Sequence, residues 1–170
     1  MKLNIVLVEP EIPQNTGNIA RTCAAIGAKM HLVHPLGFDI SEKSVKRAGL
    51  DYWDKLEIEE HNTFEDFLEK YKPEEHNMFF VTTKGKKVYC EINYFEFDEV
   101  FLLFGKETKG LPENILKKYI NNTIRIPMRE TLRSLNLSNS VAIVAYDVYR
   151  QASFDQLEEI SSYFDKNNSK

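Results

Sequence analysis

The sequence is poor in the residues that cross-link small domains or break regular structure. Among its 170 residues only Cys23 and Cys90 are cysteines, and neither lies in a C-x-x-C motif that would bind a metal or exchange disulfides. Glycine and proline number 7 and 6, and no low-complexity stretch occurs. We therefore expect two reduced, buried cysteines in a globular chain that its hydrophobic core stabilises.

Long hydrophobic runs are also absent. The apolar segment at the N-terminus ends at Glu9, so it is too short for a signal peptide or a membrane span. We expect a cytoplasmic protein with no membrane partner. The length suits a single domain, expected over residues 1–160, followed by a frayed tail at 161–170.

An excess of positive charge is lacking too. The net charge of -4 and the pI of about 5.6 argue against a general nucleic-acid binder, because phosphate contacts need clustered Lys and Arg. Acidic residues nevertheless gather within 57–75, whereas basic residues cluster at Lys43, Lys46 and Arg47, at Lys84, Lys86 and Lys87, and at Arg125, Arg129 and Arg133. Such a segregated field can steer RNA, although each cluster alone is also typical of a solvated face.

Hydrophobic periodicity predicts strands that alternate with helices. Strands are expected at 3–8, 29–34, 77–83, 99–104 and 123–126, and helices at 15–26, 41–48, from 63 onward, at 112–119, 138–152 and 155–164. Candidate helix caps are Asn15 or Thr16, Ser41, Thr63 and Ser138. The alternation favours an α/β fold with a mainly parallel sheet flanked by helices.

Polar and glycine-containing segments follow these predicted strands. They are residues 9–18, 82–85, 105–110 and 126–139. Ligands of open α/β sheets bind at the carboxyl ends of the strands, so the four segments predict one shared binding site.

The segment Phe104–Pro112 is a glycine-bounded turn after the most hydrophobic strand. It is no Walker motif, because Leu111 follows Gly110 where that motif requires Lys and then Ser or Thr. A dinucleotide-binding G-x-G-x-x-G pattern is missing as well. Spacing alone leaves two interpretations: a tight strand–helix turn, or a loop whose glycines let the backbone approach a ligand.

Two further segments combine polar side chains with a helix start. Arg21, in the first predicted helix, either faces solvent or holds a phosphate. The small polar side chains of Arg133–Ser140 cap the next helix, line a pocket, or do both. Tyr146, within that next helix, is a candidate for the core, for an interface or for base stacking.

The histidines predict no metal site. They are His31, His34, His61 and His76, and no pair has the spacing of zinc ligands together with a third partner. We therefore assign no metal.

Three segments, taken in order, resemble the motifs of the SPOUT superfamily of RNA 2′-O-methyltransferases. They are Asn15-x-Gly17-Asn18-x-x-Arg21, then Phe104-Gly105-x-Glu107-x-x-Gly110-Leu111-Pro112, then Ile126-Pro127-Met128 with Ser134-x-Asn136-x-Ser138. The segments Glu9–Pro13 and Arg47–Tyr52 are similar to those of one subgroup, the short tRNA (cytidine/uridine) wobble-position 2′-O-methyltransferases. The resemblance covers about residues 1–151.

This resemblance implies a SPOUT fold with a deep C-terminal trefoil knot and S-adenosylmethionine as the methyl donor, without a metal. The residues that it implies for cofactor binding are Val81, Thr82, Thr83, Gly105, Glu107, Gly110, Ile126, Met128, Ser134, Leu135 and Asn136.

The implied reaction is methyl transfer to the ribose 2′-hydroxyl of the wobble cytidine or uridine in a tRNA anticodon stem-loop. The resemblance assigns catalytic roles to Arg21, Asn15, Glu107 and Ser138, and RNA contact to Arg21 and Tyr146; Lys46 and Arg47 are further candidates for RNA contact. It also implies a homodimer in which Arg21 and the methyl donor come from opposite subunits. Arginine is a poor base, since its pKa exceeds about 12, so the proton acceptor is left open.

Two alternatives remain at this point. One is a SPOUT enzyme that methylates ribosomal RNA or another tRNA position. The other is a non-catalytic module that binds RNA or the cofactor.

Overall fold

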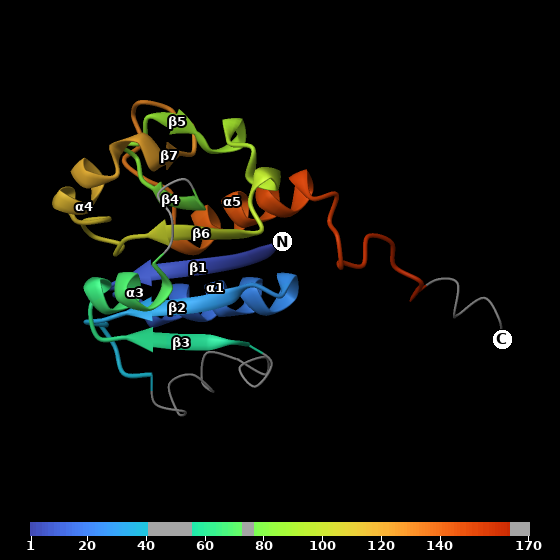
Figure 1. Ribbon diagram of the computed structural model, residues 1–170, viewed down its shortest axis with the longest axis horizontal. Helices are drawn as coiled ribbons and strands as arrows, with labels where there is room; N and C mark the ends of the chain where they lie inside the picture. The colour runs from blue at the N-terminus through green and yellow to red at the C-terminus, as the bar shows by residue number, and fades with distance from the viewer. Residues whose placement is uncertain (41–55, 73–76, 164–170) are drawn as a thin grey trace.

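The computed structural model describes residues 1–40, 56–72 and 77–163, which are built around one seven-stranded sheet (Figure 1). The strands are β1 (Lys2–Val8), β2 (Lys29–Val33), β3 (Ile58–His61), β4 (Met78–Val81), β5 (Lys87–Val88), β6 (Glu99–Phe104) and β7 (Thr123–Arg125). Their order is β3-β2-β1-β6-β4-β7-β5, and each neighbouring pair is parallel. The predicted α/β fold with a parallel sheet is confirmed.

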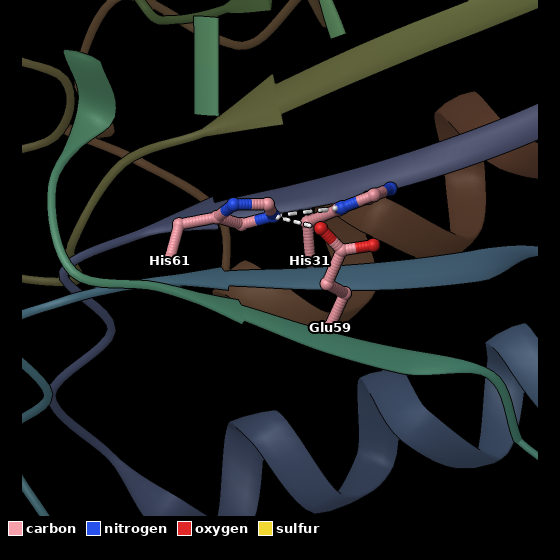
Figure 2. Close-up of side chains that lie close together, drawn as sticks. All are labelled: His31, Glu59 and His61. Atoms are coloured by element: carbon pink, nitrogen blue, oxygen red, sulfur yellow. Dashed lines mark hydrogen bonds and ion pairs between the residues drawn. The ribbon is translucent and has the colours of Figure 1, made fainter. Parts of the chain in front are cut away.

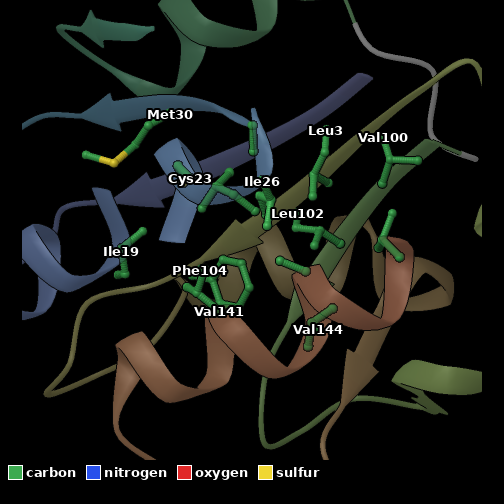
Figure 3. Packing of buried hydrophobic residues seen from close by; sticks show 14 of the residues in the cluster. Leu3, Ile19, Cys23, Ile26, Met30, Val100, Leu102, Phe104, Val141 and Val144 are labelled. Carbon is green, nitrogen blue, oxygen red and sulfur yellow. The ribbon is translucent and has the colours of Figure 1, made fainter. Parts of the chain in front are cut away.

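Helices cover both faces of this sheet (Figure 1). They are α1 (Pro13–Ile26), α3 (Phe64–Tyr71), α4 (Glu113–Lys118) and α5 (Leu137–Gln151), with short 3-10 turns η3 (Tyr89–Glu91), η4 (Tyr94–Glu96) and η5 (Ile120–Asn122). One core cluster joins α1 and α5 to the sheet through residues such as Cys23, Val144 and Phe104 (Figure 3). A second cluster joins α3 and α4 to the opposite face.

The central strands are apolar along their whole length because both of their faces are covered. Ile5, Val6 and Leu7 follow one another in β1, so they point alternately to the two faces, and each is fully buried. Such a strand has no solvent side on which polar residues would be favoured.

Two helix starts differ from the sequence prediction. Helix α1 begins at Pro13 rather than at Asn15 or Thr16, because proline needs no backbone donor in the first turn. Helix α5 begins at Leu137, and its cap is Asn136 instead of Ser138: the Asn136 side chain accepts from the backbone N–H of Ser138 and Asn139. Among the candidate caps in the described ranges, the Thr63 cap has the expected form, a capping box with Asp66; Ser41 lies outside those ranges.

Strand β3 was not predicted, since its sequence, Ile-Glu-Glu-His, lacks the apolar pattern of a buried strand. It lies at the edge of the sheet, where the Glu59 carboxylate forms ion pairs with the side-chain ammonium groups of Lys29 and Lys70. An edge strand tolerates charged side chains that a central strand does not. The two-residue β5 at the other edge was missed as well.

The expected helix at 155–164 is wrong over its described part. Residues 155–162 carry turns and extended chain instead, because Ser153, Phe154 and Gln156 have positive φ values that end the helical path after α5. The expected helix at 41–48 and most of the expected tail at 161–170 lie outside the described residues.

The two cysteines differ from each other. Cys23 is buried in α1, and burial raises the pKa of its thiol to about 12. Cys90 was expected to be buried but is exposed, because it lies in the 3-10 turn η3 at the surface. Within the described ranges, no helix combines the length and hydrophobicity that crossing a membrane requires.

Candidate active site

A cleft of about 510 Å³ lies where the polar segments after β4, β6 and β7 meet. The sequence predicted this meeting, and the structure confirms it. All of the residues expected to bind the cofactor line the cleft: Val81, Thr82, Thr83, Gly105, Glu107, Gly110, Ile126, Met128, Ser134, Leu135 and Asn136. Small-molecule sites occupy about 300–1,000 Å³, so the cleft is large enough for a nucleoside-sized ligand. That these residues bind a cofactor stays a prediction.

The loop at 105–110 needs both of its glycines. Gly110 has a φ of +69°, and its N–H donates to the Lys106 carbonyl at 2.8 Å, which closes a tight turn. A Cβ on Gly105 would lie only 2.1 Å from the carbonyl carbon of Gly110 and from the backbone nitrogen of Leu111. The loop therefore folds back on itself at a distance that only glycine allows.

Glu107 ties this loop to the segment before α1. Its carboxylate accepts from the backbone N–H of Glu11 at 2.8 Å and of Ile12 at 3.2 Å. It also accepts from the Asn15 amide at 2.9 Å. Charge-assisted bonds of this kind are about twice as strong as neutral ones, so one carboxylate holds three donors in place.

The network continues through α5. The Asn15 side-chain oxygen accepts from the Asn136 amide at 3.0 Å, and the Asn136 oxygen accepts from the Ser138 hydroxyl at 2.7 Å. Glu107, Asn15, Asn136 and Ser138, which belong to the three separate motifs, therefore form one continuous chain of hydrogen bonds. Ser138 does not line the cleft and is linked to it by its hydrogen bond to Asn136.

A second clamp between the same two segments was missed by the sequence analysis. Lys106 forms an ion pair with Glu9, which raises the pKa of the lysine. Glu11 accepts from the Thr108 hydroxyl at 2.7 Å and from its backbone N–H at 3.1 Å, and these bonds lower the pKa of the Glu11 carboxyl. The signal in the sequence was the Glu-Pro-Glu that directly follows the first strand.

The remaining predicted residues lie elsewhere. Arg21 is an exposed residue of α1, six positions after Asn15 and so about 9 Å further along the helix, and it does not line the cleft. Tyr146 is 45% exposed on α5. Lys46 and Arg47 lie outside the described residues, and their contact with RNA stays a prediction.

Four cations that were not assigned to the site also line the cleft: Lys84, Lys106, Lys109 and Arg133. Lys84 and Arg133 belong to basic clusters that are visible in the sequence, which was the only available signal. Lys84 forms an ion pair with Glu113 at 2.7 Å, as Lys106 does with Glu9.

With this geometry established, comparison with known proteins decides the family. The model of the SpoU rRNA Methylase family matches residues 2–146. The chain belongs to the SpoU methylase family.

Several relatives are similar over nearly the whole chain. Proteins named tRNA (cytidine(34)-2′-O)-methyltransferase are 45% identical in Saccharophagus degradans and 42% identical in Burkholderia ambifaria, each over 153 residues. These alignments cover 89% of this chain, and 96% and 97% of the two relatives.

Solved structures of RNA methyltransferases are also similar to this chain. One that concerns the 2-OH methylation of C/U34 on tRNA is 42% identical, with a TM-score of 0.82 over 90% of this chain and 97% of that one. The AdoMet-bound rRNA methyltransferase of Sinorhizobium meliloti is 27% identical, with a TM-score of 0.76 over 88% of this chain and 56% of that one. The resemblance to SPOUT methyltransferases is confirmed.

The Glu107 network predicts a sharp mutational effect in this SpoU-family chain. Glu107→Gln turns one carboxylate oxygen into an amide nitrogen, whose N–H groups then face either the Glu11 donor at Oε2 or the Ile12 and Asn15 donors at Oε1. We expect kcat/KM for methyl transfer to fall about 10- to 100-fold, as for the loss of one or two charge-assisted bonds. Initial-rate kinetics measure this.

The matched control is Glu65→Gln, an exposed glutamate on α3 outside the cleft. Unchanged kinetics in Glu107→Gln would show that the carboxylate does not organise the site.

Proposed function

We propose that the protein transfers a methyl group from S-adenosylmethionine to the ribose 2′-hydroxyl of the wobble cytidine or uridine of tRNA. The observation that carries this proposal is that all three motif segments meet at one cleft and are joined there by the Glu107 network. The names of the relatives, which cover almost the full chain, support the choice of substrate.

We propose different roles for different residues of the chain. S-adenosylmethionine supplies the methyl group when it is bound. The backbone around Val81, Gly105 and Ile126, together with the turn at 105–110, would hold its adenosine part through N–H and C=O groups, since these residues line the cleft. Ser134 and Leu135, which also line the cleft, would close the pocket over it.

Arg21 binds a phosphate of the RNA and so positions the ribose hydroxyl. Because Arg21 lies outside the cleft of its own chain, the proposal requires that Arg21 reach the cleft of a second copy. We therefore propose a homodimer. The apolar side chains of Ile12, Ile143 and Tyr146, which are 38–45% exposed on or next to α1 and α5, support such an interface.

The dimer is open to a direct test. We expect static light scattering at micromolar concentration to give twice the chain mass of 19.8 kDa. Ile143→Glu, which places a charge in the proposed interface, is expected to shift the mass toward the monomer. Phe95→Glu is the matched control, because Phe95 is an exposed apolar residue of η4. A monomeric mass for the unchanged protein would overturn the dimer.

The same resemblance leads us to propose that the loops around Thr83, Gly105–Gly110 and Pro127–Ser138 form a trefoil knot, that residues 1–160 are a single domain, and that the protein works in the cytoplasm, where tRNA is found.

The substrate is tested by incubating the protein with labelled S-adenosylmethionine and tRNA from cells that lack wobble methylation. Mass spectrometry of the nucleosides is expected to find 2′-O-methylated cytidine or uridine from the anticodon loop. Methylation of ribosomal RNA or of another tRNA position would replace the proposed substrate. Cofactor binding without any transfer would favour a binding module instead.

A further inference from the structure

Two neighbouring strands bring together three side chains that no sequence motif connects. His31 on β2 and Glu59 on β3 are direct partners in the parallel register, and His61 lies two residues after Glu59, on the same face of the sheet (Figure 2). Each offers one ligand atom, and these three atoms lie within 4.8 Å of one another. None of the three residues lines the cofactor cleft.

The hydrogen bonds fix which ring nitrogen of His31 faces this cluster. The Asn4 amide nitrogen donates to Glu99 at 3.0 Å, so the Asn4 oxygen is turned toward His31 Nε2, also at 3.0 Å. Nε2 therefore carries the ring proton, and Nδ1 is left with a lone pair directed at His61.

We propose that His31 Nδ1, His61 Nε2 and Glu59 Oε1 bind a divalent transition-metal ion of the zinc type. Two nitrogens bound to tetrahedral zinc at about 2.0–2.1 Å lie roughly 3.3–3.4 Å apart. His31 Nδ1 lies 3.1 Å from His61 Nε2, which in turn lies 3.4 Å from Glu59 Oε1. Asn4 orients His31 in the way that hydrogen-bonded partners orient zinc-bound histidines.

Binding requires two rearrangements, and both are local. Lys70 Nζ, 2.8 Å from Glu59 Oε1, must leave, and its side chain is 59% exposed and can turn into solvent. Lys29 stays on the other oxygen, Oε2, at 3.0 Å, and keeps Glu57 at 2.7 Å. The metal ion thus takes the place of the Lys70 ammonium group at Oε1 of Glu59.

The second rearrangement is a change of tautomer. In the hydrogen-bonded pair His61 Nε2 donates its proton to His31 Nδ1, so for metal binding that proton moves to Nδ1 of His61. No net proton is released. Asn4, Lys29 and Tyr71 each contact the cluster, and they line a neighbouring cleft of about 920 Å³ that can supply solvent for the exchange and for a fourth ligand, although the three proposed ligands do not line it themselves.

The test uses the full chain without a histidine tag, stripped of metal with EDTA. Equilibrium dialysis against Zn²⁺, followed by elemental analysis, is expected to give one zinc per chain. Co²⁺ in its place is expected to give the intense visible absorption of a tetrahedral site. Zinc is also expected to raise the midpoint of thermal unfolding, because it binds the folded state.

The variants His61→Gln and Glu59→Gln are expected to lose the bound zinc and the cobalt spectrum. His34→Gln is the matched control: His34 follows β2, its side chain is 36% exposed, and it pairs with Glu60 at 2.8 Å. Glu59→Gln keeps the test valid if His61→Gln fails to fold, since Glu59 is only partly buried. No zinc on the unchanged protein, or equal zinc on all variants, overturns the proposal. His31 and His61 would then be a hydrogen-bonded pair without a metal. The proposed methyl transfer is not affected by either result.

Discussion

Arg21→Ala is expected to lower kcat/KM for tRNA methylation by about 10²–10³-fold, which corresponds to about 3–4 kcal/mol of transition-state stabilisation. The reason is geometric. Arg21 lies outside the cleft that its own chain forms, so its removal leaves the cofactor site intact. What is lost is the guanidinium that fixes the RNA phosphate and, through it, the ribose hydroxyl.

Two measurements separate this role from a structural one. Calorimetry with S-adenosylhomocysteine is expected to give the same affinity for Arg21→Ala as for the unchanged protein. Arg150→Ala, which removes an exposed arginine that pairs with Asp147 on α5, is the matched control. Arg21→Lys is expected to recover only part of the activity, because an ammonium cannot form the bidentate contact. Full turnover in Arg21→Ala would remove the residue from the mechanism.

Gly105→Ala is expected to weaken the binding of the cofactor rather than the positioning of the RNA. The added methyl group would lie 2.1 Å from backbone atoms of Gly110 and Leu111, which cannot move aside as a flexible side chain would. Overpacking of this kind costs about 1–3 kcal/mol. Because the strain falls on the turn that lines the cleft, we expect the Kd for S-adenosylhomocysteine to rise roughly 10- to 100-fold.

Gly27→Ala is the matched control for this substitution. Gly27 has a positive φ, +67°, but a Cβ there meets nothing within 4 Å, and the residue lies at the far end of α1. It is expected to lose some stability and to keep its affinity for the cofactor. If Gly105→Ala bound the cofactor as tightly as Gly27→Ala, the close approach of the loop would have no role in binding.

Much of the architecture was already present in the order of the residues. The apolar strands, the alternation with helices and the polar segments after the strands predicted a parallel sheet with one site at its carboxyl edge. These features are local, because a buried strand needs an apolar run and a loop at its end needs glycine or polar residues. The resemblance of the three motifs then placed the chain in its family.

Only the tertiary structure decided which distant groups meet. The start of α1 at Pro13 leaves Asn15 to bond Glu107 and Asn136 instead of capping a helix. Cys90 is exposed because its 3-10 turn lies at the surface, which its hydrophobic character did not reveal.

The cluster of His31, Glu59 and His61 is the clearest case. His31 and His61 are 30 positions apart, so their spacing in the sequence does not resemble that of zinc ligands and predicts no metal site. Strand β3 was not predicted because its sequence is charged. It pairs with β2 in parallel register, which places His61 Nε2 3.1 Å from His31 Nδ1. Sequence by itself determined the local elements and the family, because both depend on short runs of residues. Register between strands decided this cluster, because a shift of one residue would turn His61 to the other face of the sheet.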